Sequence, residues 1–135
     1  MSDTVQVSVR QISASASRGQ ARSHQLVMDR PEPKGGMDQG PMGGEVLLKG
    51  LGGCFMSNLL AAAVARKVTI TNASVDISAT VTPSPTRFSA VDMTIGMACD
   101  EPEVIPKLVE IAERGCLVAN TLKNALTLNL HLMEA

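Results

Sequence analysis

Three cysteines are the residues of this sequence best suited to chemistry, and each stands in a different context. Cys54 follows Leu51-Gly52-Gly53 in a long apolar segment, Cys99 ends an alternating segment, and Cys116 directly follows Gly115. The reactive form of a cysteine is the thiolate, which needs a nearby cation or a helix N-terminus. Burial in apolar surroundings raises the pKa of a thiol and makes it inert. The chemistry to weigh is therefore thiolate and redox chemistry.

Two interpretations of Cys54 remain open from the residues alone. As a core residue it would act as a small buried hydrophobe. As a nucleophile it would use the space that the neighbouring glycines clear beside its sulfur, together with a cation that holds the thiolate. The sequence does not choose among the nearest cations, which are Arg30, Lys34, Lys49 and Arg66.

The other two cysteines are expected to differ in role. Cys116 follows a glycine that predicts the end of a helix, and it is placed to open a short helix over residues 117–123, whose N-terminus would favour a thiolate. The alternative is a residue that packs between two helices. One sulfur on a constrained helix and another at a mobile junction suit attack by the first thiol and resolution by the second. Cys99 shares the apolar face of its strand with Met97, so we expect a core residue.

Composition and charge argue against several other functions. His24 and His131 do not stand at ligand spacing with the cysteines, so no metal and no cofactor is expected. The net charge is −1 and both Trp and Tyr are absent, so nucleic-acid binding is not expected. The uncharged run over residues 50–65 is too short and too polar for a good membrane span. Because the first residues are polar, no signal peptide is expected, and a cytoplasmic protein is expected.

Hydrophobic patterning predicts a single α+β domain over residues 1–135, with the element order ββαββααβ. Val5, Val7 and Val9 predict a half-buried strand, and a turn at Ser17–Gln20 leads into a second strand that ends near Met28. The proline- and glycine-rich residues 31–44 are typical of a flexible connection. The remaining strands are expected as a hairpin around residues 75–81 and 91–97, and as a last strand over the alternating leucines of 126–132.

Three helices are expected, over residues 45–66, 105–115 and 117–123. Asp100 and Glu103 are candidates to cap the second helix. Phe88 is out of phase with its strand, which indicates a bulge or a late strand start. The first helix is apolar on almost every side, and a helix of that kind must be covered on every side. Because the chain is short, a partner subunit is the natural cover, and we expect an obligate homodimer.

Three segments together resemble the OsmC/Ohr family of thiol-dependent peroxidases, and specifically its OsmC-like branch. The resemblance extends over essentially the whole chain. It implies the OsmC-like fold, in which a long central helix packs on antiparallel sheet in an intertwined homodimer with two sites at the interface. The segments are Asp29-Arg30-Pro31 with Gly35–Pro41, then Glu45–Cys54, and finally Ala112–Leu122.

The resemblance also implies roles for four residues. Cys54 would attack the peroxide, and Cys116 would resolve the sulfenate as a Cys54–Cys116 disulfide. Arg30 is the best match to the active-site arginine, and Glu45 corresponds to the acidic residue that orients it. Met42-Gly43-Gly44 departs from the family, because a proline-containing lead usually precedes this helix.

The implied activity is reduction of hydroperoxides, with organic hydroperoxides favoured over hydrogen peroxide and an external dithiol as reductant. The alternative is a non-catalytic, stress-associated binding protein that retains the fold and the sulfurs. The departure at residues 42–44 favours that alternative.

Overall fold

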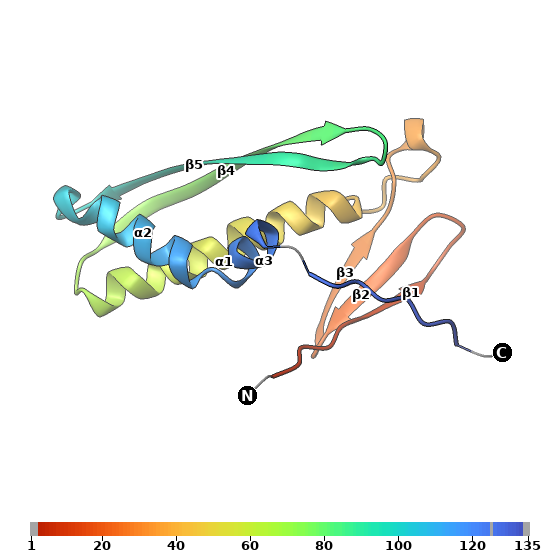
Figure 1. Cartoon of the computed structure of the whole chain (residues 1–135), viewed down its shortest axis with the longest axis horizontal. Helices are drawn as coiled ribbons and strands as arrows, with labels where there is room; N and C mark the ends of the chain where they lie inside the picture. The colour runs from red at the N-terminus through yellow and green to blue at the C-terminus, as the bar shows by residue number, and fades with distance from the viewer. Residues whose placement is uncertain (1–2, 125, 134–135) are drawn as a thin grey trace. The chain divides into compact units, whose positions relative to one another are not determined.

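The computed structural model describes residues 3–124 and 126–133, and their elements are labelled in Figure 1. The chain folds as two compact units, Met1–Lys49 and Gly50–Ala135, which are described in turn. The elements in chain order are β1 (Ser8–Gln11), β2 (Ser17–Ala21), β3 (His24–Met28), the 3-10 turn η1 (Glu32–Lys34), α1 (Gly43–Ala65), β4 (Ile70–Thr82), β5 (Arg87–Cys99), the 3-10 turn η2 (Pro102–Val104), α2 (Ile105–Gly115) and α3 (Leu117–Lys123).

The first unit holds an antiparallel sheet with the strand order β1-β2-β3. The turn predicted at Ser17–Gln20 is wrong, because those residues belong to β2 and the chain turns instead at Arg22, which has φ 54°. Gly19 lies within β2, where it pairs with Val9 and Leu26, and a Cβ there would lie 3.2 Å from the Met28 methyl group. Three strands therefore precede α1, where two were expected.

The valines at the start of the chain are exposed rather than half-buried. β1 begins only at Ser8, and Val5, Val7 and Val9 all have more than half of their surface open to solvent. β1 is an edge strand that pairs only with β2 among the described strands. No element of the described chain covers the apolar face of these three valines, so the half-buried strand that their alternation predicted is not found.

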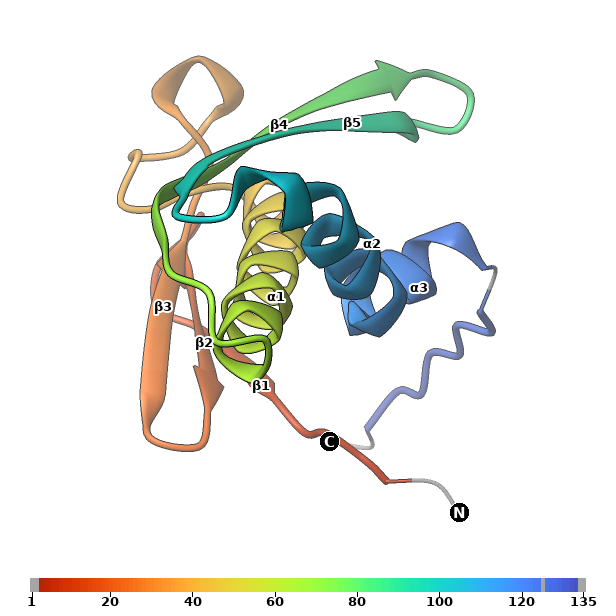
Figure 2. The ribbon, with the colours of Figure 1, turned by 90° about the vertical axis from the view of Figure 1, so that its left-hand side faces the viewer.

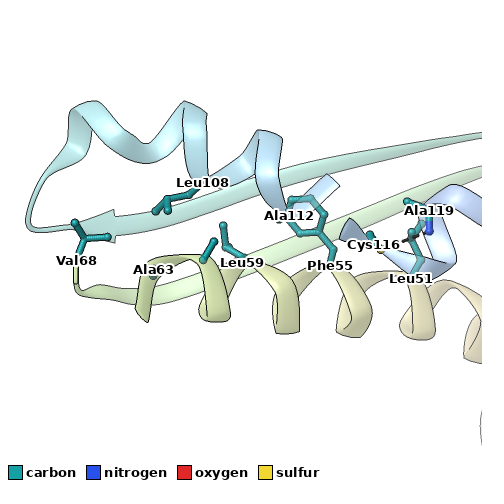
Figure 3. Packing of buried hydrophobic residues seen from close by; sticks show 10 residues of the cluster. Leu51, Phe55, Leu59, Ala63, Val68, Leu108, Ala112, Cys116 and Ala119 are labelled. Carbon is teal, nitrogen blue, oxygen red and sulfur yellow. Dashed lines mark hydrogen bonds between the residues drawn. The ribbon is translucent and has the colours of Figure 1, made fainter. Parts of the chain in front are cut away.

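The second unit is built on the part of α1 from Gly50 onward. The long β4–β5 hairpin and α2 lie against this helix (Figure 2). Leu51, Phe55 and Leu59 of α1 are buried, and they meet Leu108 and Ala112 of α2 in the core (Figure 3). Burial of such side chains stabilises the fold by about 1.5–3 kcal/mol each. This core holds α1 and α2 in a fixed relation.

The hairpin and its predicted irregularity are confirmed. β4 and β5 pair in antiparallel register, with a register shift between Thr80 and Val81. Val81 pairs with Phe88 beyond this shift, and both side chains are exposed near the hairpin tip. The bulge accounts for the phase of Phe88, because an extra residue moves the side chains that follow to the other face of the strand.

Both C-terminal helices are confirmed, and α3 has the predicted bounds. The predicted cap by Asp100 and Glu103 is wrong, since the N-cap residue of α2 is Val104 and no side chain caps it. The Asp100 carboxylate instead accepts the Thr69 N–H at 3.0 Å. Asp100 therefore joins the end of β5 to the start of β4.

The predicted last strand is not formed. Residues 126–133 carry no strand, and their leucines have between 65% and 99% of their surface exposed. A strand exists only through pairing with a neighbour, and no described strand pairs with this segment. The α+β class with antiparallel sheets is confirmed, and the described order is βββαββαα.

One face of α1 is exposed, so the cover expected on every side is absent within the described chain. The exposed residues recur every three or four positions along the second unit's part of the helix. By length and composition α1 is able to cross a membrane, yet its opposite face forms the hydrophobic core of the second unit. The exposed stripe comprises Gly50, Gly53, Ser57, Leu60 and Val64.

Candidate thiol site

The fold brings two of the three cysteines together. Cys54 is half-buried on α1, and Cys116 is fully buried between α2 and α3. The side chain of Cys116 lowers the pKa of Cys54, and Cys54 in turn raises the pKa of Cys116, so the two thiols lie close enough to interact. Cys99 lies apart, packed against the core at the end of β5, where its thiol donates to the Glu101 carbonyl at 3.4 Å. The pair therefore forms from Cys54 and Cys116, as the resemblance implied.

A break between two helices places Cys116. α2 ends at Gly115, and Cys116 adopts an extended conformation with φ −77° and ψ 109° before α3 begins. As N-cap residue of α3, Cys116 accepts the Ala119 N–H through its sulfur at 3.4 Å. Asn58 lies against Gly115 and donates to the Cys54 carbonyl at 3.1 Å. Asn58 therefore links the Cys54 turn of α1 to the junction that carries Cys116.

The surroundings shift the pKa values of the two thiols in opposite directions. The Val118 N–H is the largest cause that lowers the pKa of Cys54, and the Cys116 thiol and the Leu117 N–H lower it further against the effect of burial. Burial is the largest cause that raises the pKa of Cys116, and the neighbouring Cys54 raises it too. The thiolate therefore forms first at Cys54.

This arrangement corrects one expectation from the sequence. The N-terminus of α3 was expected to favour a thiolate at Cys116, whereas its first N–H groups lower the pKa of Cys54. The reason is positional. Cys116 is the buried cap residue itself, while the N–H groups of the two residues that follow the cap lower the pKa of Cys54.

Arg30 and Glu45 belong to the first unit, and the structure does not join them by an ion pair among the described residues. Arg30 is exposed just after β3. The Glu45 carboxylate accepts the Met42 N–H at 2.8 Å. Since Glu45 is the third residue of α1, this contact is half of a capping box. Glu45 therefore stabilises the start of its own helix.

Sequence reasoning gave Asp29 no role of its own, yet it organises the loop that carries Arg30. Asp29 is buried, and its carboxylate accepts the N–H groups of Arg30, Met37 and Gln39 at 2.7, 3.1 and 3.2 Å. The glycine-rich segment is consequently a folded loop rather than the flexible connection that its composition indicated. Aspartate commonly accepts N–H groups of the turn that follows it. The position of Asp29 directly before the glycine-rich loop was therefore a signal of this role in the sequence.

Burial by itself would raise the pKa of Asp29. The N–H groups of Gln39, Arg30 and Met37, with the Ser15 side chain, outweigh burial and hold the pKa below its ordinary value. The carboxylate is therefore the form on which the loop is built.

No group of three His, Cys, Asp or Glu side chains within residues 3–124 and 126–133 is placed to hold a metal ion.

Comparison with known proteins agrees with the fold. The sequence model described as OsmC-like protein matches residues 36–131, which is most of the chain. The chain therefore belongs to the OsmC-like family. No curated protein sequence matches it significantly.

Solved structures share the fold at low identity. An OsmC-like protein from Mycoplasma pneumoniae aligns with a TM-score of 0.78 and 18% identity, covering 91% of this chain and 89% of the other. An OsmC-like hydroperoxide resistance protein from Jannaschia sp. CCS1 aligns with a TM-score of 0.60 and 21% identity, covering 93% and 89%. An organic hydroperoxide resistance protein from Elizabethkingia anophelis aligns with a TM-score of 0.61 and 18% identity, covering 91% and 90%.

Proposed function

We propose that this protein is a thiol-dependent peroxidase that reduces organic hydroperoxides, and hydrogen peroxide more weakly. The observation that carries the proposal is the close pair of Cys54 and Cys116 thiols, whose pKa values are shifted in opposite directions. A peroxidase of this kind needs one thiol that ionises readily and a second that stays protonated nearby. Two structural relatives are named hydroperoxide resistance proteins, which supports the same reaction class.

The reaction balances in three steps. The Cys54 thiolate attacks one peroxide oxygen and breaks the O–O bond; with one proton the products are an alcohol and the Cys54 sulfenic acid. The Cys116 thiol then condenses with the sulfenic acid, which releases water and forms the Cys54–Cys116 disulfide. An external dithiol, for example the dithiol of a cytoplasmic redox protein, reduces the disulfide to two thiols and is itself oxidised to a disulfide.

Arg30 is proposed to hold the thiolate and the peroxide, and Glu45 to orient the guanidinium. Support for Arg30 comes from the folded loop that presents it exposed. In the described chain the Glu45 carboxylate accepts the Met42 N–H instead, so orienting Arg30 would require it to leave this contact. A guanidinium suits this task because it keeps its charge and offers several N–H donors to an anion.

A homodimer is proposed as the working form. The exposed stripe of α1 is made of small and apolar residues, and neither Gly50 nor Gly53 has an atom within 4 Å of the place a Cβ would occupy. Small residues allow two helices to approach closely, and apolar area removed from water stabilises the contact. The proposed occupant of this face is α1 of a second copy.

Peroxide consumption tests the function directly. Wild type, Cys54→Ser and Cys99→Ser are compared with tert-butyl hydroperoxide and hydrogen peroxide, with dithiothreitol as the dithiol. We expect turnover in wild type and Cys99→Ser, faster with the organic peroxide, and loss of turnover in Cys54→Ser. Cys99→Ser is the matched control, because it removes one thiol from the same chain without touching the pair. Equal consumption by wild type and Cys54→Ser would reject the proposal.

The second candidate is a stress-associated binding protein without useful turnover. The observation in its favour is that Glu45 caps α1 and forms no ion pair with Arg30 among the described residues. A folded wild-type protein that consumes neither peroxide would support this candidate.

A further inference from the structure

The first unit contains a buried carboxylate that the proposed chemistry leaves unused. Asp29 is only 4% exposed and stands at the end of β3, directly before Arg30. One carboxylate oxygen accepts the Arg30 N–H, and the other accepts the N–H groups of Met37 and Gln39. Three donors from separate parts of the loop converge on one side chain, so the carboxylate closes residues 29–39 into a ring.

The same loop holds the main chain of Arg30 from its other side. The Arg30 carbonyl accepts the Asp38 N–H at 3.0 Å. Gly36 packs so closely that a Cβ there would lie 2.0 Å from the Arg30 carbonyl oxygen, so only glycine fits. The Asp29 N–H donates to the Pro41 carbonyl at 3.1 Å, which anchors the ring to the chain leading into α1. The main chain of Arg30 is therefore held at both its N–H and its carbonyl.

The side chain of Arg30 is free by contrast. It is exposed, and the ion pairs found among residues 3–124 and 126–133 do not include it. Burying a carboxylate costs free energy unless hydrogen bonds compensate it, and a solvated surface arginine would need no such support. Because the main chain of Arg30 is already fixed, less conformational entropy is lost when its guanidinium binds an anion.

We propose that Asp29 is the positioning residue for Arg30. Its carboxylate fixes the ring of residues 29–39 so that the guanidinium is presented to an anionic sulfur and the peroxide bound there. The inference rests on the proposed function. In it, Asp29 does not touch the substrate but orients Arg30, which does.

The test compares two substitutions that remove the same charge from the same loop. Asp29→Asn leaves one oxygen where the three N–H groups need two, because the amide nitrogen is itself a donor. Asp38→Asn is the matched control, since Asp38 is exposed and its φ of 54° is one that asparagine tolerates. We expect Asp29→Asn to slow reduction of tert-butyl hydroperoxide by about ten- to a hundredfold. Asp38→Asn should stay within about twofold of wild type.

A double-mutant cycle separates positioning from a structural role. If Asp29 acts through Arg30, Asp29→Asn has no further effect once Arg30→Ala is present. An equal loss in both backgrounds would mean that Asp29 only supports the fold, and wild-type rates in Asp29→Asn would show that no positioning is needed. Either outcome overturns the proposal.

Alkylation of Cys54 by iodoacetamide gives the same cycle a readout that needs no turnover. We expect Asp29→Asn to slow alkylation at neutral pH only where Arg30 is present. Wild type that consumes no peroxide would reject the peroxidase function, while coupling in alkylation would still support the positioning role. Absence of coupling in alkylation would overturn the positioning role even in an active peroxidase.

Discussion

Cys54 and Cys116 are 62 residues apart in the sequence, yet in the folded chain their thiols lie close enough that each shifts the pKa of the other. The contact depends on three features: the core that joins α1 to α2, the end of α2 at Gly115, and the extended conformation of Cys116. The first prediction tests the chemistry for which this contact is suited.

One equivalent of tert-butyl hydroperoxide per subunit should form a Cys54–Cys116 disulfide within one chain. A disulfide needs its two Cα atoms within about 7 Å, and the sulfur contact favours this pair over any pair with Cys99. Peptide mapping by mass spectrometry under non-reducing conditions checks the linkage. Cys54 sulfinate alone, or a Cys54–Cys99 bridge, would contradict the resolving role of Cys116.

Leu117→Pro should raise the pKa of Cys54 and slow its alkylation at neutral pH several-fold. Leu117 is the first residue of α3, where proline is tolerated but has no N–H to donate. The preceding Cys116 is extended, which suits the residue before a proline. Iodoacetamide rates measured against pH report the shift.

Leu117→Ala is the control for this prediction, because it removes the same exposed side chain and keeps the N–H. Since the pKa of Cys54 is lowered in the fold, its thiolate fraction at neutral pH exceeds that of an ordinary cysteine. Leu117→Pro should move the alkylation curve toward higher pH. An unchanged curve would show that this N–H does not hold the thiolate.

Cys99→Ala should leave peroxide turnover nearly unchanged and cost at most about 1 kcal/mol of unfolding free energy. The side chain is half-buried against the core, and its thiol donates to the Glu101 carbonyl and, at 3.8 Å, to the Asp100 carboxylate, both of which lie close to it in the sequence. Urea unfolding and steady-state turnover measure the two quantities. A loss of turnover as large as that of Cys54→Ser would show that Cys99 belongs to the site.

Gly53→Glu should dissociate the proposed homodimer. The position is open in the single chain, and glutamate favours helix more than glycine does by roughly 0.5–1 kcal/mol, so an isolated subunit has no reason to unfold. Gly53→Ala gives a similar gain in helix propensity without bulk or charge, and serves as control. Analytical ultracentrifugation decides the outcome. A stable, folded wild-type monomer at micromolar concentration would contradict the obligate dimer.

Mixed dimers test which subunit uses Glu45. α1 is one helix from Gly43 to Ala65, and nine residues at about 100° each leave Glu45 and Cys54 half a turn out of alignment. We therefore expect Glu45 to serve the site whose Cys54 belongs to the partner. A dimer of one Glu45→Ala chain and one Cys54→Ser chain should keep about half of wild-type activity, since one site remains intact. Activity as low as that of the worse parent would assign Glu45 to its own chain.

Local patterning by itself determined the elements whose signals are short in range. Alternation predicted the β4–β5 hairpin, and the phase of Phe88 predicted its irregularity near Val81. Helical spacing with a glycine stop predicted α2 and α3. These predictions succeed because turn chemistry and side-chain periodicity act within a few residues. The three cysteines, which lack metal-ligand spacing, also predicted thiol chemistry.

Tertiary structure decided what depends on distant neighbours. Gly19 resembles a turn residue in the sequence, but it pairs with Val9 and Leu26 in the middle of the three-stranded sheet. The leucines of residues 126–132 alternate as a strand does, yet a strand needs a partner that local sequence does not supply. Which thiol ionises first follows from burial and from the N–H groups of α3. The Asp29 carboxylate accepts the N–H groups of Arg30, Met37 and Gln39, and only the folded loop brings the last two of these to it.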